Sequence, residues 1–153
     1  MERIVLADAS GIASMRRRAM ELARSCALPE SDAGRLAIVV TEMASNAVRH
    51  GADAAMLLGG DPDAGLVECI CVDRGRGMSD IAACMRDGFS TAGTPGTGLG
   101  AIRRQSDAFD IYSLPQRGTA VLSRVLRQGR DPGQVQRRHG AVCIAKSGEQ
   151  ISG

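Results

Sequence analysis

The apolar residues near the amino terminus predict one strand followed by an amphipathic helix. Ile4–Ala7 is a short apolar run bounded by charged residues, which is typical of a strand. Across Ile12–Cys26 the apolar side chains recur every three or four positions, and this is the period of one helix face. Ser10 or Gly11 lies where we expect the cap of this helix.

A second and longer helical pattern follows Leu28. Pro29 suits the start of a helix, because the first turn does not need its missing N–H. The apolar positions then continue at helical spacing to about Arg49, and Gly51 is typical of a helix end. We therefore expect one helix over 29–49.

Two hairpins and two shorter helices are predicted over the next part of the chain. The strands of the first hairpin are Ala54–Leu58 and Leu66–Val72, joined by the turn formers of 59–65. The second hairpin pairs Phe109–Leu114 with Thr119–Arg127. Helices are predicted at 79–86 and 99–106, with a segment rich in Gly, Thr and Ser at 87–97. This order indicates an α+β two-layer sandwich, in which a mostly antiparallel mixed sheet carries helices on one face.

The amino-acid composition of the chain changes after residue 127. Residues 128–139 are polar, basic and rich in turn formers, which indicates a linker. Ala141–Ala145 then predicts a new strand, followed by a turn over 146–150. We expect one domain at 1–127, a basic linker at 128–139, and at 140–153 either an extra β hairpin or the start of a further domain.

Composition and charge argue against several classes of protein. The apolar share of 44% and the charged share of 24% are ordinary for a soluble globular domain. The net charge is only +2, and the basic clusters at Arg16–Arg18 and Arg137–Arg138 lack interleaved aromatic residues. A solvated helix face or a protein-docking patch therefore fits them better than nucleic-acid binding. No signal peptide or membrane-spanning run is recognisable, so we expect a cytoplasmic protein without membrane contact.

The cysteine pattern indicates reduced side chains. Their number is odd, no C-x-x-C pair occurs, and Cys69 and Cys71 would share one face of a strand. We interpret all of them as reduced core residues of a protein in a reducing compartment. The cysteines are Cys26, Cys69, Cys71, Cys84 and Cys143.

Candidate chemistry appears first near the end of the long predicted helix. Glu42 and Asn46 lie four residues apart, so they project from one face about a turn from each other. This pair can hold a base and a metal-binding oxygen over a common site. A solvated helix face is the ordinary explanation of such a pair, so its meaning depends on the rest of the chain.

Two glycine-rich segments add to the helix pair. Asp73-x-Gly75-x-Gly77 follows a predicted strand; a carboxylate there can accept a hydrogen bond from the exocyclic amine of adenine, and guanine lacks this amine. Glycines at 93, 96, 98 and 100 precede a helix, whose exposed amides suit phosphate oxygens. A P-loop is excluded because the segment has no lysine, and a dinucleotide fingerprint because no strand precedes it.

These three segments resemble the N, G1 and G2 boxes of the GHKL, or Bergerat-fold, ATPases. The segments 85–93 and 98–104 further resemble the RsbT-type branch of small serine/threonine kinases from bacterial partner-switching stress modules. The resemblance covers roughly residues 3–127. It implies the Bergerat ATP-binding fold.

The resemblance also implies a site for ATP or ADP with Mg²⁺. It implies that Glu42 is the general base and that Asn46 binds Mg²⁺ through its amide oxygen. Asp73 would read adenine, and Thr119 would help to hold the base. The remaining implied nucleotide-binding residues are Gly75, Gly77, Thr91, Gly96, Gly98, Leu99 and Gly100.

The chain departs from the family pattern in having no lysine in the N box or the glycine-rich segment. Phosphate charge would then be met by Mg²⁺, backbone amides and arginine, with Arg49 and Arg86 as candidates. For His50, at the end of the N box, a local structural role is favoured over a phosphate contact.

The function that the resemblance implies is that of an ATP- and Mg²⁺-dependent serine/threonine protein kinase, an anti-sigma regulatory factor that phosphorylates a STAS-domain antagonist protein. The alternative is a nucleotide-binding interaction module that controls a sigma factor or an attached phosphatase domain without phosphotransfer. A histidine kinase domain ranks third, since no phosphoacceptor helix precedes the N box. A homodimer remains open. Residues 140–153 weakly resemble the start of SpoIIE-type serine/threonine phosphatases, which implies a kinase–phosphatase fusion.

Overall fold

A single antiparallel sheet organises the chain. The computed structural model describes residues 1–6, 8–85 and 98–130. In this part five strands form one sheet in the order β1-β2-β3-β5-β4, and every neighbouring pair is antiparallel. The strands are β1 (Glu2–Val5), β2 (Ala55–Asp61), β3 (Leu66–Asp73), β4 (Ala108–Leu114) and β5 (Gly118–Leu126). The helices are α1 (Ala9–Ser25), α2 (Glu30–His50), α3 (Ile81–Cys84) and α4 (Gly98–Gln105).

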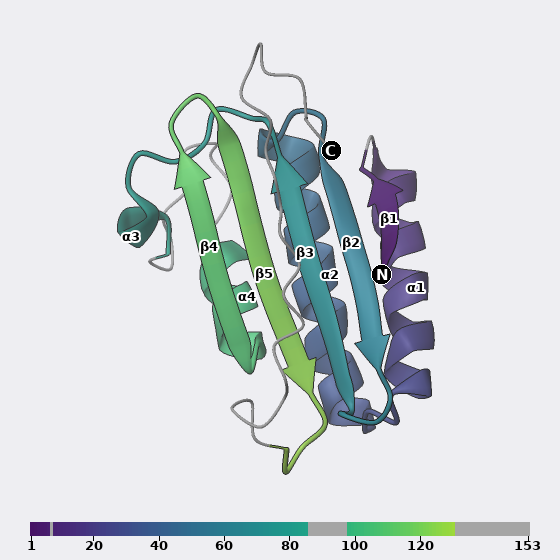
Figure 1. The fold of residues 1–153 in the computed structure, drawn as a ribbon. Coiled ribbons are helices and arrows are strands. Elements are labelled where there is room, and N and C mark those ends of the chain that lie inside the picture. Colours follow the sequence, from purple (N-terminus) through teal and green to yellow (C-terminus); the bar gives the residue numbers. More distant parts are fainter. Residues whose placement is uncertain (7, 86–97, 131–153) are drawn as a thin grey trace, which may run out of the picture.

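The helices α1, α2 and α4 all lie on one face of this sheet (Figure 1). The predicted α+β two-layer class is therefore confirmed. Strand β3 occupies the centre because the second hairpin joins the sheet through β5, its later strand. This arrangement places Asp73, the last residue of β3, directly opposite Thr119 of β5.

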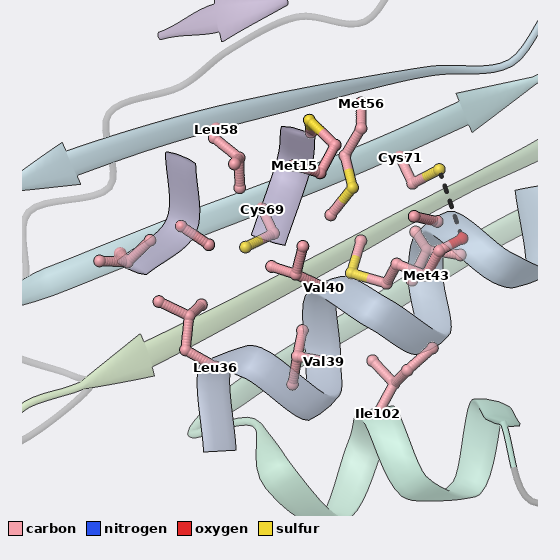
Figure 2. Packing of buried hydrophobic residues seen from close by; sticks show 14 of the residues in the cluster. Met15, Leu36, Val39, Val40, Met43, Met56, Leu58, Cys69, Cys71 and Ile102 are labelled. Atoms are coloured by element: carbon pink, nitrogen blue, oxygen red, sulfur yellow. Dashed lines mark hydrogen bonds between the residues drawn. The ribbon is translucent and has the colours of Figure 1, made fainter. Parts of the chain in front are cut away.

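The core between the two layers is aliphatic and rich in sulfur. Met15 of α1, Val40 of α2 and Met56 of β2 are completely buried and converge on the sheet (Figure 2). Cys69 and Cys71 point into the same core, as period-two alternation along β3 requires. A core with so few aromatic residues relies on close packing of many small and flexible side chains.

The cysteines in the described part are free, as expected. Cys26, Cys69 and Cys71 are buried. Burial raises the pKa of the Cys71 thiol to about 12, and it raises that of Cys69 further. Such thiols stay protonated and unreactive at neutral pH. Cys84 is partly exposed, and Cys143 lies outside the described residues.

The start of the chain differs from the prediction. The first strand is Glu2–Val5, and its register with β2 pairs Glu2 with Leu58. The cap of α1 is Asp8, whose carboxylate accepts hydrogen bonds from the N–H groups of Ser10 at 2.8 Å and Gly11 at 3.2 Å. The expected cap at Ser10 or Gly11 is therefore wrong, because the aspartate satisfies the first free amides of the helix.

Strand β2 is also longer than predicted. Gly59 and Gly60, expected in a turn, continue the ladder opposite Glu68 and Val67. A Cβ on Gly60 would lie 2.8 Å from Sγ of Cys26, so the glycine here allows the end of α1 to pack against the sheet. The turn itself is confined to residues 62–65.

An ion-pair cluster joins the start of α2 to the far ends of α4 and β5. Arg35 donates to Asp32 at 3.0 Å and to Asp107 at 3.0 Å. It also donates to the carbonyls of Gln105 and Leu126, each at 3.3 Å. Asp32 is buried, with 4% of its surface exposed. The sequence pattern did not predict this cluster, because its members are far apart along the chain.

Several expected elements lie wholly or partly outside the described residues. They are the glycine-rich segment up to residue 97, the linker from residue 131 and the strand at 141–145. Among the helices that are described, none is long and apolar enough to cross a lipid bilayer.

Candidate functional site

The face of α2 that carries Glu42 and Asn46 lies against the first residue of α4. A Cβ on Gly98 would come 2.8 Å from Nδ2 and 3.0 Å from Oδ1 of Asn46. The same atom would lie 3.3 Å from Oε2 of Glu42. The predicted acid, amide and glycine are therefore in direct contact, although 52 positions separate Asn46 from Gly98 along the chain. Only a residue without a side chain leaves the carboxamide in this position.

Asp73 lies at the other end of this arrangement, beside the last turn of α2. Its Oδ1 accepts a hydrogen bond of 2.7 Å from the N–H of Gly75. A Cβ on Gly51 would lie 2.8 Å from Cβ of Asp73, and one on Gly75 would lie 2.5 Å from the carbonyl oxygen of His50. These glycines allow the end of β3 and the end of α2 to touch. The C-terminal half of α2 thus connects Glu42 and Asn46 to Asp73.

The environment of Asp73 favours proton binding more than water does. Burial raises the pKa of its carboxyl above the ordinary value of 3.8, while hydrogen bonds from the backbone of Gly75 and Thr119 and the nearby His50 ring oppose this rise. A carboxylate has about four acceptor positions. The group therefore retains acceptor capacity for a ligand after binding the Gly75 amide.

Thr119 is held by a partner that the sequence reasoning missed. Its Oγ1 lies 2.9 Å from Oγ of Ser113, and Ser113 also accepts a hydrogen bond of 2.9 Å from the N–H of Met78. Ser113 thereby connects β4, β5 and the loop after Asp73. The predicted strands set Leu114 opposite Thr119, whereas the observed register pairs Leu114 with Gly118 and Ser113 with Thr119, so the sequence reasoning did not find this contact.

Two other glycines make the loops around Asp73 sterically feasible. Gly118 has φ of +115°, and a Cβ there would collide with the carbonyl oxygen of Asp73. Gly77 has φ of +63°, and a Cβ there would collide with the carbonyl oxygen of Leu114. Side chains at these positions would be strained and would push the hairpin turn away from β3.

His50 and Arg49 form the exposed end of α2. Partial desolvation lowers the pKa of His50, and the positive charges of Arg76 and Arg49 lower it further. The ring is therefore neutral at pH 7. The close approach of Gly75 involves the backbone carbonyl of His50, so the role of the His50 ring remains a prediction.

The other predicted site residues fall into two groups. Gly100 is buried in α4, and Leu99 packs against the hydrophobic core. Thr91, Gly96 and Arg86 lie outside the described residues. Their predicted roles in nucleotide binding remain predictions.

The described residues contain no group of three or more His, Cys, Asp or Glu side chains suited to a metal ion. A divalent cation at this site would need most of its oxygen ligands from elsewhere. The amide oxygen of Asn46 is a ligand of the kind that a hard cation prefers. The described donor set therefore fits a Mg²⁺ ion that arrives with a ligand supplying further oxygen atoms.

Comparisons with known proteins address the family and the fold of the chain. Residues 5–124 match the model of the histidine kinase-like ATPase domain family. The chain is also 29% identical over 112 residues to the serine/threonine-protein kinase RsbT of Bacillus subtilis (strain 168), a match that covers 72% of this chain and 84% of that protein.

Two solved structures are similar in fold. The mycobacterial sensor histidine kinase MprB aligns with a TM-score of 0.51 and 16% identity, over 81% of this chain and 95% of that chain. Full-length ShkA in complex with AMPPNP aligns with a TM-score of 0.53 and 20% identity, over 82% of this chain. The aligned region spans only 31% of the ShkA chain.

Proposed function

The chain belongs to the histidine kinase-like ATPase domain family, and we propose that it is an ATP- and Mg²⁺-dependent serine/threonine protein kinase acting on a STAS-domain antagonist protein. Membership of the family implies that the domain binds ATP. The distant relationship to RsbT, which is named as a serine/threonine-protein kinase, favours a protein hydroxyl as the acceptor.

One observation carries the proposal. Gly98, at the start of α4, lies close to both Glu42 and Asn46, the two candidate site residues of α2. Backbone amides at a helix start attract phosphate oxygens. A phosphate near this point would lie beside a carboxylate able to take a proton and an amide oxygen able to bind a cation. This is the set of groups that phosphoryl transfer requires.

Asp73 supports the other end of the proposed nucleotide site. Its carboxylate would accept a hydrogen bond from the amine of adenine, while Gly75 and Gly77 leave space for a flat ring beside it. Thr119, fixed by Ser113, would hold the base from the neighbouring strand. The ShkA structure carries AMPPNP, an adenine nucleotide analogue, which agrees with this assignment by fold alone.

Mg²⁺, when bound with the nucleotide, would neutralise charge on the phosphates, and the amide oxygen of Asn46 would help to hold it. Glu42 would accept the proton of the attacking serine or threonine hydroxyl. The hydroxyl oxygen would form a bond to the γ-phosphorus as the bond from that phosphorus to the β,γ-bridging oxygen breaks. ADP would leave, and the proton would remain on Glu42 until solvent removes it.

The test is phosphate transfer from γ-labelled ATP to a cognate STAS-domain protein. We expect phosphoserine or phosphothreonine with the native chain. Glu42→Gln should slow the transfer by roughly 10²–10⁴-fold, the usual contribution of a general base. Glu30→Gln, an exposed glutamate in the first turn of the same helix, is the matched control and should leave the rate unchanged.

The outcomes separate the candidate functions. Transfer that persists in Glu42→Gln would exclude Glu42 as the base. Nucleotide-dependent association with a partner but no transfer would instead support the regulatory interaction module, which controls a sigma factor or phosphatase domain. Calorimetry that detects no ADP or ATP binding at millimolar concentration would overturn both.

A further inference from the structure

Three segments that are far apart in the sequence meet at the end of the sheet where Asp73 lies. The N–H of Arg74 donates to the carbonyl of Ala52 at 2.7 Å, which joins the loop after β3 to the end of α2. The N–H of Gln116 donates to the carbonyl of Arg76 at 2.8 Å, which joins the same loop to the β4–β5 turn. The carboxyl end of β3 and this turn lie at the same end of the molecule (Figure 1). The segments that these contacts bring together are residues 49–53, 74–78 and 114–118.

Each of these segments carries arginine at its surface. The exposed arginines, which we call the arginine rim, are Arg49, Arg74, Arg76 and Arg117. Across the same three segments the acidic residue is Asp53 alone. The rim is therefore a local excess of positive charge, although the net charge of the whole chain is only +2.

The rim arginines differ from other arginines of the fold in their ion pairs. Arg35 and Arg124 pair with carboxylates of the domain itself. Within the residues that the structure describes, Arg49, Arg74 and Arg117 form no such ion pair. Positive charges gathered in one place repel one another, and a ligand of opposite charge would relieve this repulsion.

The rim begins close to the proposed catalytic groups. Arg49 follows Asn46 by three residues on α2, which is a rise of about 4.5 Å along the helix axis. Glu42 lies one further turn along the same helix. The His50 ring feels the field of the rim, because desolvation lowers its pKa and the charges of Arg76 and Arg49 lower it further. A protein bound to the rim can therefore present a hydroxyl group to the catalytic pair.

We propose that the arginine rim binds an acidic segment of the protein that receives the phosphate, an inference that rests on the proposed function. A guanidinium group is planar and pairs with a carboxylate through two parallel hydrogen bonds. Complementary charge of this kind also speeds the encounter of two proteins.

Nucleic acid is the rival ligand of the rim. Binding of single strands normally combines basic residues with aromatic side chains on which bases stack. The three segments contain no Phe, Trp or Tyr, and the net charge of the chain is small. These observations favour an acidic protein.

Fluorescence anisotropy of a labelled glutamate-rich peptide tests the rim in the full chain without requiring catalysis. The rim variant combines Arg74→Gln with Arg117→Gln. Its matched control combines Arg24→Gln with Arg103→Gln, which removes the same charge from two exposed positions in the last turns of α1 and α4. Both control positions lie at the opposite end of the sheet, since α1 and α4 end beside the first residue of β3 and the last residue of β5.

At low salt (about 20 mM) the native chain and the control should bind the peptide equally, and the rim variant should bind it roughly five- to tenfold more weakly. The difference should shrink at about 0.5 M salt, because ions screen exposed charges. Calorimetry should give the same ADP affinity for all three proteins.

Several results would overturn the proposal. They are equal peptide binding by the rim variant and the control, and failure of the native chain to bind the peptide. Tighter binding of a single-stranded oligonucleotide that is lost in the rim variant would assign the rim to nucleic acid instead. A lower ADP affinity in the rim variant alone would assign it to the nucleotide.

Phosphate transfer to the STAS-domain acceptor gives an independent measurement. The rim variant should have a KM for the acceptor protein that is roughly five- to tenfold higher, with kcat and the KM for ATP unchanged, and the control should match the native chain. An unchanged KM for the acceptor would show that the acceptor is not the ligand of the rim. If the native chain transfers no phosphate, the proposed function fails, while the peptide assay still decides whether the rim binds an acidic ligand.

Discussion

Removal of Arg35 tests how much of the domain's stability depends on the cluster at the start of α2. The perturbation is Arg35→Met, which keeps the length and apolar stem of the side chain but removes its charge. In the structure this guanidinium lies between Asp32 and Asp107 and also donates to two carbonyl groups. The variant would leave the buried Asp32 carboxylate with the hydrogen bond that it accepts from the N–H of Gln128, at 2.8 Å.

The expected cost follows from burial. Breaking a buried ion pair by removing one partner costs about 3–5 kcal/mol, because the other charge stays desolvated. The side chain of Asp32 is 6% exposed, but those of Arg35 and Asp107 are each 27% exposed, so water can replace part of the lost interaction. We therefore expect a loss of about 2–4 kcal/mol in the free energy of unfolding, and a Tm lower by roughly 10 °C.

Urea unfolding followed by circular dichroism measures this loss, since the chain has no tryptophan. Arg18→Met is the matched control, because Arg18 also forms two ion pairs, with Glu2 and Glu21, but all three side chains are at least 38% exposed. Exposed pairs contribute little, so its midpoint should hardly move. If both variants unfolded at the same urea concentration, burial would not be what makes the Arg35 cluster important.

Three further predictions concern the proposed nucleotide site. Gly98→Ala should displace the Asn46 carboxamide and weaken Mg·ATP binding by about tenfold or more, while the Tm stays near the native value. The control is Gly34→Ala at an exposed helix position, which should raise the free energy of unfolding by about 0.5–1 kcal/mol without affecting nucleotide binding. Gly118→Ala should cost about 2–4 kcal/mol in thermal unfolding, because its φ is +115° and its Cβ meets backbone. Asp73→Asn should weaken ADP binding and flatten its pH profile. The raised pKa of Asp73 means that, as the pH falls, the carboxyl of the native protein takes up its proton before the pH reaches 3.8. Without nucleotide, Asp73→Asn should have a higher Tm than the native protein at neutral pH, because it removes a charge that burial disfavours. This difference in Tm should shrink as the pH falls through the folded-state pKa of Asp73.

Local pattern was sufficient to predict most of the elements. The helical spacing of apolar residues predicted α1 and α2, and the alternation and turn residues predicted both hairpins within a few positions of their bounds. The class of fold followed from the order of these elements. Spacing along α2 also indicated that Glu42 and Asn46 share a face. These features depend on residues close together in the chain, so they can be predicted from the sequence.

Errors arose where a distant contact outweighed local preference. Gly59 and Gly60 read as turn residues, yet β2 continues through them because they pair with β3 and allow Cys26 to approach. The cap at Asp8 was missed because a carboxylate two residues before the expected position satisfies the helix amides. Propensity is a weak guide at such points, since pairing and packing contribute more free energy.

By itself, then, the sequence determined the period of each element and the class of the fold, and it indicated candidate residues for binding a nucleotide. The tertiary structure decided that β5, not β4, lies beside β3, which sets Asp73 opposite Thr119, and that Ser113 contacts Thr119. It also decided that Gly98 touches Asn46, and that Arg35 joins Asp32 to Asp107. The reason is physical: these contacts form between residues far apart in the chain, and their geometry exists only once the sheet and helices have packed.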